Sequence, residues 1–165
     1  MMKIKLLIFG VIALLLSGCT KDYVDVKSNN YATVQLVPQS KTLLFSDDYY
    51  AFIYDYSKGC QGEEELGILE TDSDTPSRIA KIPINKPLRF AVYYRVQSGN
   101  STYKEFTSFI LKPQKYANYK IKYEKKDLNL FRSVSDFNVY MKQGNKRMQV
   151  PNSRIREFNY EKECQ

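Results

Sequence analysis

Hydrophobic and polar positions alternate with a period of two along much of this chain. The clearest stretch is residues 88–97, in which Leu88, Phe90, Val92, Tyr94 and Val96 alternate with Arg89, Ala91, Tyr93, Arg95 and Gln97. Successive side chains of a β-strand point to opposite faces of the sheet. The pattern therefore predicts a strand with one buried face and one face that is mostly exposed to solvent.

The same alternation predicts several further strands. They cover residues 31–37, 49–56, 102–111, 115–126, 133–142 and 147–150, with weaker candidates at 79–84 and 155–160. In the stretch 49–56, we expect Tyr50, Phe52, Tyr54 and Tyr56 to form the core side. Turn-forming residues at 98–101 and 143–146 predict tight connections between neighbouring strands.

The remaining segments limit the possible folds. No stretch after residue 18 shows a sustained helical period, although residues 39–48 could contain a helical turn. Pro83 and Pro87 confine the candidate strand 79–84 to a sheet edge or a strand end. We therefore expect an all-β domain, an antiparallel β-sandwich of about seven to nine strands, immunoglobulin- or transthyretin-like. A small β-barrel is the alternative.

The first twenty residues have a different pattern. Lys3 and Lys5 precede an apolar run, Leu6–Leu16, which is shorter than the roughly 20 residues that a membrane-spanning helix needs. A basic start followed by a short apolar run is typical of a secretory signal peptide. The sequence Leu16-Ser17-Gly18-Cys19 that follows closely resembles the lipobox of bacterial lipoproteins. An ordinary signal peptide cut near Ser17 is the alternative.

This resemblance implies an anchor and a location. In bacterial lipoproteins the cysteine thiol receives a diacylglyceryl group, the signal is cut just before it, and the new amine is usually acylated. The resemblance thus implies removal of residues 1–18 and stable membrane anchoring through lipid on Cys19. Thr20 replaces the aspartate that retains enteric lipoproteins at the inner membrane, which implies the outer membrane, facing the periplasm. We expect residues 19–30 to be a flexible tether and residues 31–165 a single domain.

Cysteine count and charge change with this assignment. With Cys19 lipidated, Cys60 and Cys164 remain as a pair in an oxidising compartment, which predicts a disulfide, with two free thiols as the alternative. A bridge across a loop of about 100 residues contributes about 4.7 kcal/mol in the chain-entropy model.

The formal net charge is +7, of which Lys3 and Lys5 supply two. Available anions in the periplasm are lipid head groups, lipopolysaccharide and peptidoglycan, so we expect no nucleic-acid partner.

The chain contains no histidine, which limits its chemistry. Ser-His-Asp and Cys-His catalysis are excluded, and two well-separated cysteines cannot alone form a structural zinc site. Acidic groups at 47–48, 63–65 and 72–74 could in principle supply a carboxylate pair for glycan hydrolysis. We interpret them as solvated loop charges. We therefore predict no catalytic residue, no metal and no cofactor.

Two groups of residues are candidates for a partner-binding surface. The chain has 14 tyrosines and no tryptophan, and we expect the rings of Tyr49 and Tyr93 to point outward, where tyrosine is favoured at protein interfaces. The basic candidates are Lys120, Lys122, Lys146 and Arg147, which could form a cationic strip rimmed by aromatic rings. The simpler interpretation is that charged outward faces prevent sheets from associating edge to edge.

Together these features predict a non-enzymatic, lipid-anchored envelope protein. We expect its β-sandwich surface to bind a partner in the envelope, either a protein assembly or a cell-wall component such as peptidoglycan. Two alternatives stay open: a carboxylate-based glycan hydrolase and a purely structural envelope lipoprotein.

Overall fold

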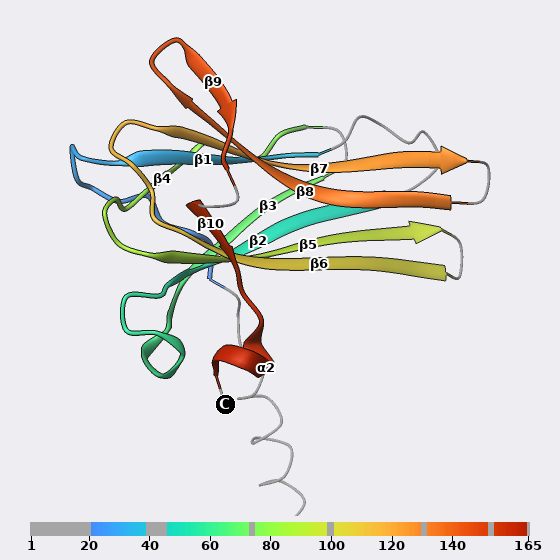
Figure 1. Ribbon diagram of the computed structural model, residues 1–165, viewed down its shortest axis with the longest axis horizontal. Coiled ribbons are helices and arrows are strands. Elements are labelled where there is room, and N and C mark those ends of the chain that lie inside the picture. Colours follow the sequence, from blue (N-terminus) through green and yellow to red (C-terminus); the bar gives the residue numbers. More distant parts are fainter. Residues whose placement is uncertain are drawn as a thin grey trace, which may run out of the picture.

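The computed structural model describes residues 21–38, 46–72, 75–98, 101–129, 132–151 and 154–164. They form two β-sheets stacked face to face, which confirms the predicted β-sandwich (Figure 1). The ten strands are β1 (Ala32–Val37), β2 (Ser46–Asp55), β3 (Glu64–Asp72), β4 (Ala80–Ile82), β5 (Leu88–Ser98), β6 (Ser101–Leu111), β7 (Asn118–Asn129), β8 (Arg132–Gln143), β9 (Lys146–Gln149) and β10 (Ile155–Glu157). Two short helices complete the described elements, η1 (Cys60–Gly62) and α2 (Tyr160–Glu163). The expected signal peptide, Cys19 and residues 39–45 lie outside the described residues.

Each sheet contains five strands. The order is β4-β1-β7-β8-β9 in one, here called the β7 sheet, and β10-β6-β5-β2-β3 in the other, the β5 sheet. Among the described strand pairs, only β1 and β7 run parallel. The predicted hairpins join β5 to β6 and β8 to β9. At the second turn Gly144 has φ 58°, a conformation that glycine adopts without strain.

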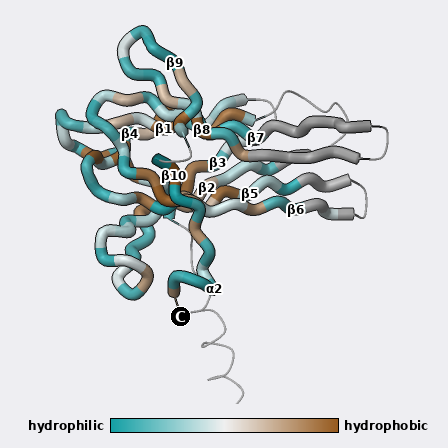
Figure 2. The backbone as a smooth tube through the Cα atoms, in the orientation of Figure 1, coloured by the Kyte–Doolittle hydropathy of each residue, from teal (hydrophilic) through white to brown (hydrophobic). Residues whose placement is uncertain are grey.

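The core lies between the sheets, and β1, β5 and β7 supply alternate residues to it, as predicted. Its members from these strands are at most 2% exposed: Ala32, Val34, Leu36, Leu88, Phe90, Val92, Tyr119, Ile121 and Tyr123. Figure 2 shows hydrophobic stretches gathered in the middle of the sandwich, whereas α2 is hydrophilic. The strand alternation thus places every second residue on an outer face.

The predicted orientation of β2 is wrong. Tyr49, Ala51 and Ile53 are fully buried, whereas Tyr50 stacks on Tyr93 on the outer side of the sheet. The register explains the inversion, because each of the three buried residues pairs directly with a core residue of β5. Directly paired residues share one face of a sheet.

Tyr49 is therefore a core residue and not the outward contact residue that the sequence predicted. It is 0% exposed, and its hydroxyl donates a hydrogen bond to the carbonyl of Ile121 at 3.1 Å. Burial raises the pKa of Tyr49. This hydrogen bond joins the two sheets across the core.

The edge strand β3 is absent from the sequence prediction, which placed Glu63–Glu65 in a loop. Leu69 is 2% exposed and packs in the core. Gly67 has φ 134°, and a Cβ at this position would lie 2.6 Å from the Cα of Tyr23. Glycine is required here because the N-terminal segment (Lys21–Val26) passes directly against the strand.

The N-terminal segment seals one edge of the sandwich. The N–H of Tyr23 donates to the carbonyl of Ile68 in β3 at 3.0 Å, and the Tyr23 hydroxyl donates to the carbonyl of Lys81 in β4 at 3.0 Å. The Tyr23 side chain is 3% exposed. The prediction of a flexible tether over residues 19–30 is therefore wrong for Lys21–Val26, where the chain is already docked.

The predicted disulfide between Cys60 and Cys164 is present, with the two Cα atoms 5.5 Å apart. It ties η1 to the end of α2, whose first turn is capped by the Asn159 side chain. Phe158, just before the helix, is 6% exposed and packs edge-on against Tyr56. The disulfide thus holds the C-terminal segment against the β5 sheet.

Candidate functional site

The outer side of β7, β8 and β9 carries a group of cations around one tyrosine. We call this group the cationic face; it consists of Lys120, Lys122, Tyr140, Lys142 and Arg147. The alternating residues of β7 and β8 point into the core, so these side chains must point outward. The strand register then brings residues from three strands together.

Two cross-strand pairs organise the cationic face. Lys120 of β7 stands directly opposite Tyr140 of β8, and Lys142 of β8 stands opposite Arg147 of β9. Side chains of directly opposed residues are close neighbours on one face of the sheet. The three strands therefore present a continuous surface rather than separate charges.

Tyr140 is the centre of this surface. The Lys122 ammonium and the Arg147 guanidinium each lie 5.5 Å from the centroid of the Tyr140 ring. A cation over a ring at this distance contributes about 0.5–1 kcal/mol at an exposed site. The ring thus orients two cations that would otherwise repel each other.

A groove runs across the cationic face. Its volume is about 380 Å³, and it is lined by Asn118, Lys120, Tyr140, Met141, Lys142, Asn145 and Arg147. This volume lies within the range of small-ligand sites, roughly 300–1,000 Å³. The lining combines positive charge, two side-chain amides and an aromatic ring, which suits an anionic ligand that also carries hydroxyl or amide groups.

The charges of the cationic face are not neutralised by the described part of the protein. The ion pairs between described residues involve Arg78, Lys86, Arg89, Arg95 and Arg156, and none involves a cation of this face. No described residue that lines the groove is acidic. The face therefore attracts anions from solution.

The structure brings together three of the four basic residues predicted from sequence. Lys120, Lys122 and Arg147 surround Tyr140, whereas Lys146 lies exposed beside the β8–β9 turn and does not line the groove. Tyr140 and Lys142 were missed. For Lys142 the available signal was the pairing of residues across the predicted turn at 143–146, which sets it opposite Arg147.

Tyr93 lies on the outer side of the other sheet, in a group we call the aromatic face: Tyr50, Phe52, Tyr54, Tyr93 and Phe106. The Tyr93 ring centroid is 5.1 Å from that of Tyr50 and 4.7 Å from that of Phe106. The prediction that Tyr93 points outward is confirmed. Its ring packs with its neighbours, and it does not join the basic residues in one site.

A buried ion pair adjoins the aromatic face. Arg89 is 7% exposed, and its Nε donates to the Glu63 carboxylate at 2.7 Å, while a second guanidinium nitrogen donates to the other oxygen. The guanidinium lies between the rings of Tyr54 and Phe158, 4.0 and 4.9 Å from their centroids. Burial alone would lower the pKa of Arg89, but the hydrogen bond and charge of Glu63 raise it.

Two of the acidic groups considered for catalysis have partners in the structure. Glu63 is held by Arg89, and Asp48 pairs with Arg95 at 3.1 Å. Within the described ranges, no group of three or more Cys, Asp or Glu residues is arranged to hold a metal ion.

The described residues also contain no helix that is long and apolar enough to cross a membrane.

The cationic face thus combines, on one surface, four cations without a described ion-pair partner, an aromatic ring and a groove. No protein-family model, curated protein or solved structure matches this chain, so this assignment rests on the geometry of its own residues.

Proposed function

We propose that this protein is a lipid-anchored, non-enzymatic envelope protein whose cationic face binds an anionic partner in the periplasm. The observation that carries the proposal is a surface of four cations beside Tyr140, two of them over its ring, none of which takes part in a described ion pair. Unneutralised like charges on one surface cost stability, which is a common feature of binding sites.

The anchor in this proposal is Cys19. Its support is the basic start, the short apolar run and the lipobox-like Leu16–Cys19. Lipid on Cys19 with removal of residues 1–18 would make Cys19 the first residue of the mature chain. Thr20, in place of aspartate, supports the outer membrane as the destination.

The docked N-terminal segment makes the tether short. Cys19 precedes Lys21 by two residues, so their Cα atoms are at most about 7 Å apart. Lys21 accepts a hydrogen bond from Ile68 of β3, and β3 lies at the edge of its sheet. The lipid would therefore attach beside the edge formed by β3 and β4.

This attachment directs the cationic face away from the anchor. β4 and β9 lie at opposite edges of the β7 sheet, and the face extends over β7, β8 and β9. Figure 1 shows the β8–β9 hairpin projecting away from the β5 sheet. The arrangement favours a partner that lies off the anchoring membrane over the head groups of that same membrane.

Peptidoglycan has the chemistry that suits this face. It carries carboxylates that pair with lysine and arginine, and sugar hydroxyls and amides that can bond to Asn118 and Asn145 in the groove. We therefore favour the cell wall over an acidic protein surface as the partner.

The anchor is tested by substituting Cys19→Ser in the full chain, expressed in a bacterium with an outer membrane. The variant should lose acylation and leave the membrane fraction. Fractionation with membranes at the unchanged level would refute lipid anchoring.

The partner is tested by co-sedimentation with purified, insoluble peptidoglycan. We expect binding that weakens as salt is raised, because exposed charges are screened. If the protein does not bind peptidoglycan and crosslinking in cells reproducibly captures one acidic protein, the partner is a protein and not the cell wall. Release of soluble glycan fragments in the same assay would favour the hydrolase instead.

A further inference from the structure

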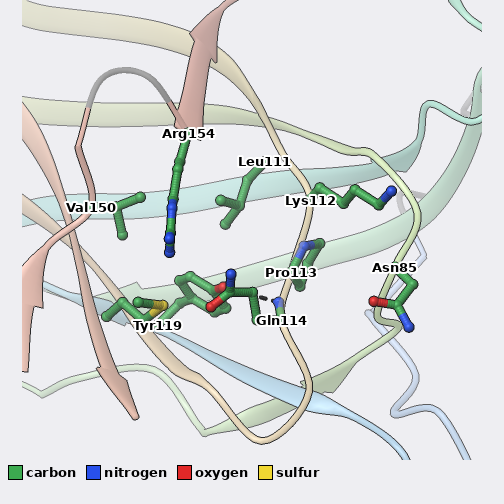
Figure 3. Close-up of a pocket in the computed structure, with 9 residues that line it drawn as sticks. Asn85, Leu111, Lys112, Pro113, Gln114, Tyr119, Val150 and Arg154 are labelled. Atoms are coloured by element: carbon green, nitrogen blue, oxygen red, sulfur yellow. Dashed lines mark hydrogen bonds between the residues drawn. The ribbon is translucent and has the colours of Figure 1, made fainter. Parts of the chain in front are cut away.

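The edge of the sandwich opposite the N-terminal segment contains a cavity of about 420 Å³. It is lined by Asn85, Leu111, Lys112, Pro113, Gln114, Tyr119, Met141, Val150 and Arg154. Figure 3 shows Arg154 reaching between Val150 and Leu111 towards Tyr119 and Gln114. The cavity lies between the end of β6 and the residues that follow β9, and no buried side chain equivalent to Tyr23 fills it among the described residues.

One part of the cavity wall is apolar. Leu111, Met141 and Val150 are 3%, 4% and 2% exposed, and each belongs to the core cluster. Pro113 is also fully buried. A ligand in this cavity would therefore place apolar groups against the end of the core, which is favourable by about 25 cal/mol per Å² of apolar area removed from water.

The other lining residues are polar, and their charges favour an anion. Arg154 and Lys112 supply positive charge, and no residue that lines the cavity is acidic. The guanidinium of Arg154 extends towards Tyr119, whereas Lys112 lies on the rim and points towards Asn85 (Figure 3). An anion entering here would meet Arg154 first inside the cavity.

Tyr119 supplies a hydrogen-bond donor beside Arg154. Its hydroxyl accepts a hydrogen bond from the backbone N–H of Gln114 at 3.0 Å, which leaves the hydroxyl hydrogen available to a ligand. The residue is 2% exposed, and burial raises the pKa of Tyr119, so the hydroxyl stays protonated at neutral pH. A buried hydroxyl of this kind is expected to donate to some acceptor.

A second cavity of about 360 Å³ lies next to the first. Val150 lines both cavities, and Phe109, Phe137 and Ile155 supply apolar walls to the second. Glu157 also lines the second cavity. Its negative charge would repel an anionic group there, so a ligand occupying both cavities has only one favourable direction.

We propose that these cavities bind a single-tailed organic carboxylate, such as a fatty acid. The carboxylate would accept hydrogen bonds from Arg154 and Tyr119, and the tail would lie against Leu111, Met141 and Val150 towards the second cavity. This site is separate from the cationic face, and it does not depend on the lipid anchor or on the periplasmic partner.

The test is a titration with decanoate, followed by amide NMR and calorimetry. The protein used is the chain from residue 19 onward with Cys19→Ser, which contains every described strand. Decanoate should shift the amide signals of residues that line the two cavities. Decanol, which lacks the charge, should bind about tenfold more weakly, and acetate, which lacks the tail, should not bind measurably.

Two substitutions separate this site from nonspecific binding. Arg154→Gln should weaken decanoate binding about tenfold, and Tyr119→Phe about fivefold. Arg147→Gln on the cationic face is the matched control and should leave affinity unchanged. Equal affinity for decanoate and decanol, unchanged affinity in Arg154→Gln, or signal shifts confined to residues outside the cavities would each overturn the proposal.

Discussion

The outer side of the β5 sheet and the outer side of the β7 sheet both carry charged and aromatic residues at alternate strand positions. On the β5 side, Arg89 is paired with Glu63 and Arg95 with Asp48, and the rings of the aromatic face pack on one another. On the β7 side, four cations share a surface with a single ring, two of them over it, and none takes part in a described ion pair. The same alternation thus produces one surface whose groups satisfy each other and one whose charges remain available.

This difference separates stabilising residues from binding residues. Substitutions on the β5 side should reduce stability, because they leave buried or stacked groups without partners. Substitutions in the cationic face should leave stability nearly unchanged and alter only what the protein binds.

The largest effect is expected at the buried ion pair. Glu63→Gln leaves the Arg89 charge buried without its counter-ion, which should lower the free energy of unfolding by about 3–5 kcal/mol in urea denaturation. The matched control is Asp48→Asn, which breaks an exposed pair on the same side, with 45% and 43% side-chain exposure. That change should cost about 0–1 kcal/mol. Equal costs for the two substitutions would contradict the account.

Removal of the disulfide should have the next largest effect. The double substitution Cys60→Ser with Cys164→Ser should lower the free energy of unfolding by about 2–5 kcal/mol. Because the disulfide holds Phe158 over Arg89, hydrogen exchange should increase first in the C-terminal segment and in β10. Unchanged exchange there, with faster exchange in β7 and β8, would show that the bridge does not support the β5 side.

A substitution in the aromatic face should lower the free energy of unfolding by a smaller amount. Tyr93→Leu removes ring contacts with Tyr50 and Phe106 and should destabilise the protein by about 1 kcal/mol. Tyr140→Leu in the cationic face should cost less than Tyr93→Leu, yet it should weaken peptidoglycan binding. A result in which Tyr93→Leu abolishes that binding would transfer the binding role to the aromatic face.

The smallest effect on stability is expected from neutralising the cationic face. A variant with glutamine at positions 120, 122, 142 and 147 should unfold within about 0.5 kcal/mol of the unsubstituted chain, because the loss of two cation–ring contacts is offset by the relief of repulsion among the four cations. Thermal and urea denaturation measure this directly. Marked destabilisation would mean that these cations are structural.

Much of the fold follows from the sequence pattern because its strands alternate clearly. In β1, β5 and β7 apolar residues alternate with mostly polar ones, and their described core residues and the β5–β6 and β8–β9 pairings were predicted correctly. The side chain of Val96, predicted to point inward, and residues 99–100 of the predicted turn lie outside the described part. The predicted orientation of β2 was wrong because both faces of this strand carry apolar or aromatic residues. Only its pairing with β5 determines which face is buried. β3 was not predicted because its acidic first residues interrupt the apolar pattern to which the core residue Leu69 belongs.

The candidate site could be predicted only in part for a related reason. Lys120 and Lys122 were found because they alternate within one strand, and Arg147 because it follows a turn. Tyr140 has no local signal that separates it from the other tyrosines. Its role appears only when the register places it opposite Lys120 and between two cations.

The most direct test of the account is peptidoglycan co-sedimentation with two variants of equal net charge. One replaces Lys120, Lys122, Lys142 and Arg147 by glutamine; the other replaces four exposed lysines elsewhere, Lys27, Lys58, Lys104 and Lys162. The account predicts that the first variant binds about tenfold more weakly or worse, while the second binds like the unsubstituted chain. Equal weakening in both variants would show that net charge alone determines binding, and it would contradict a specific role for the cationic face.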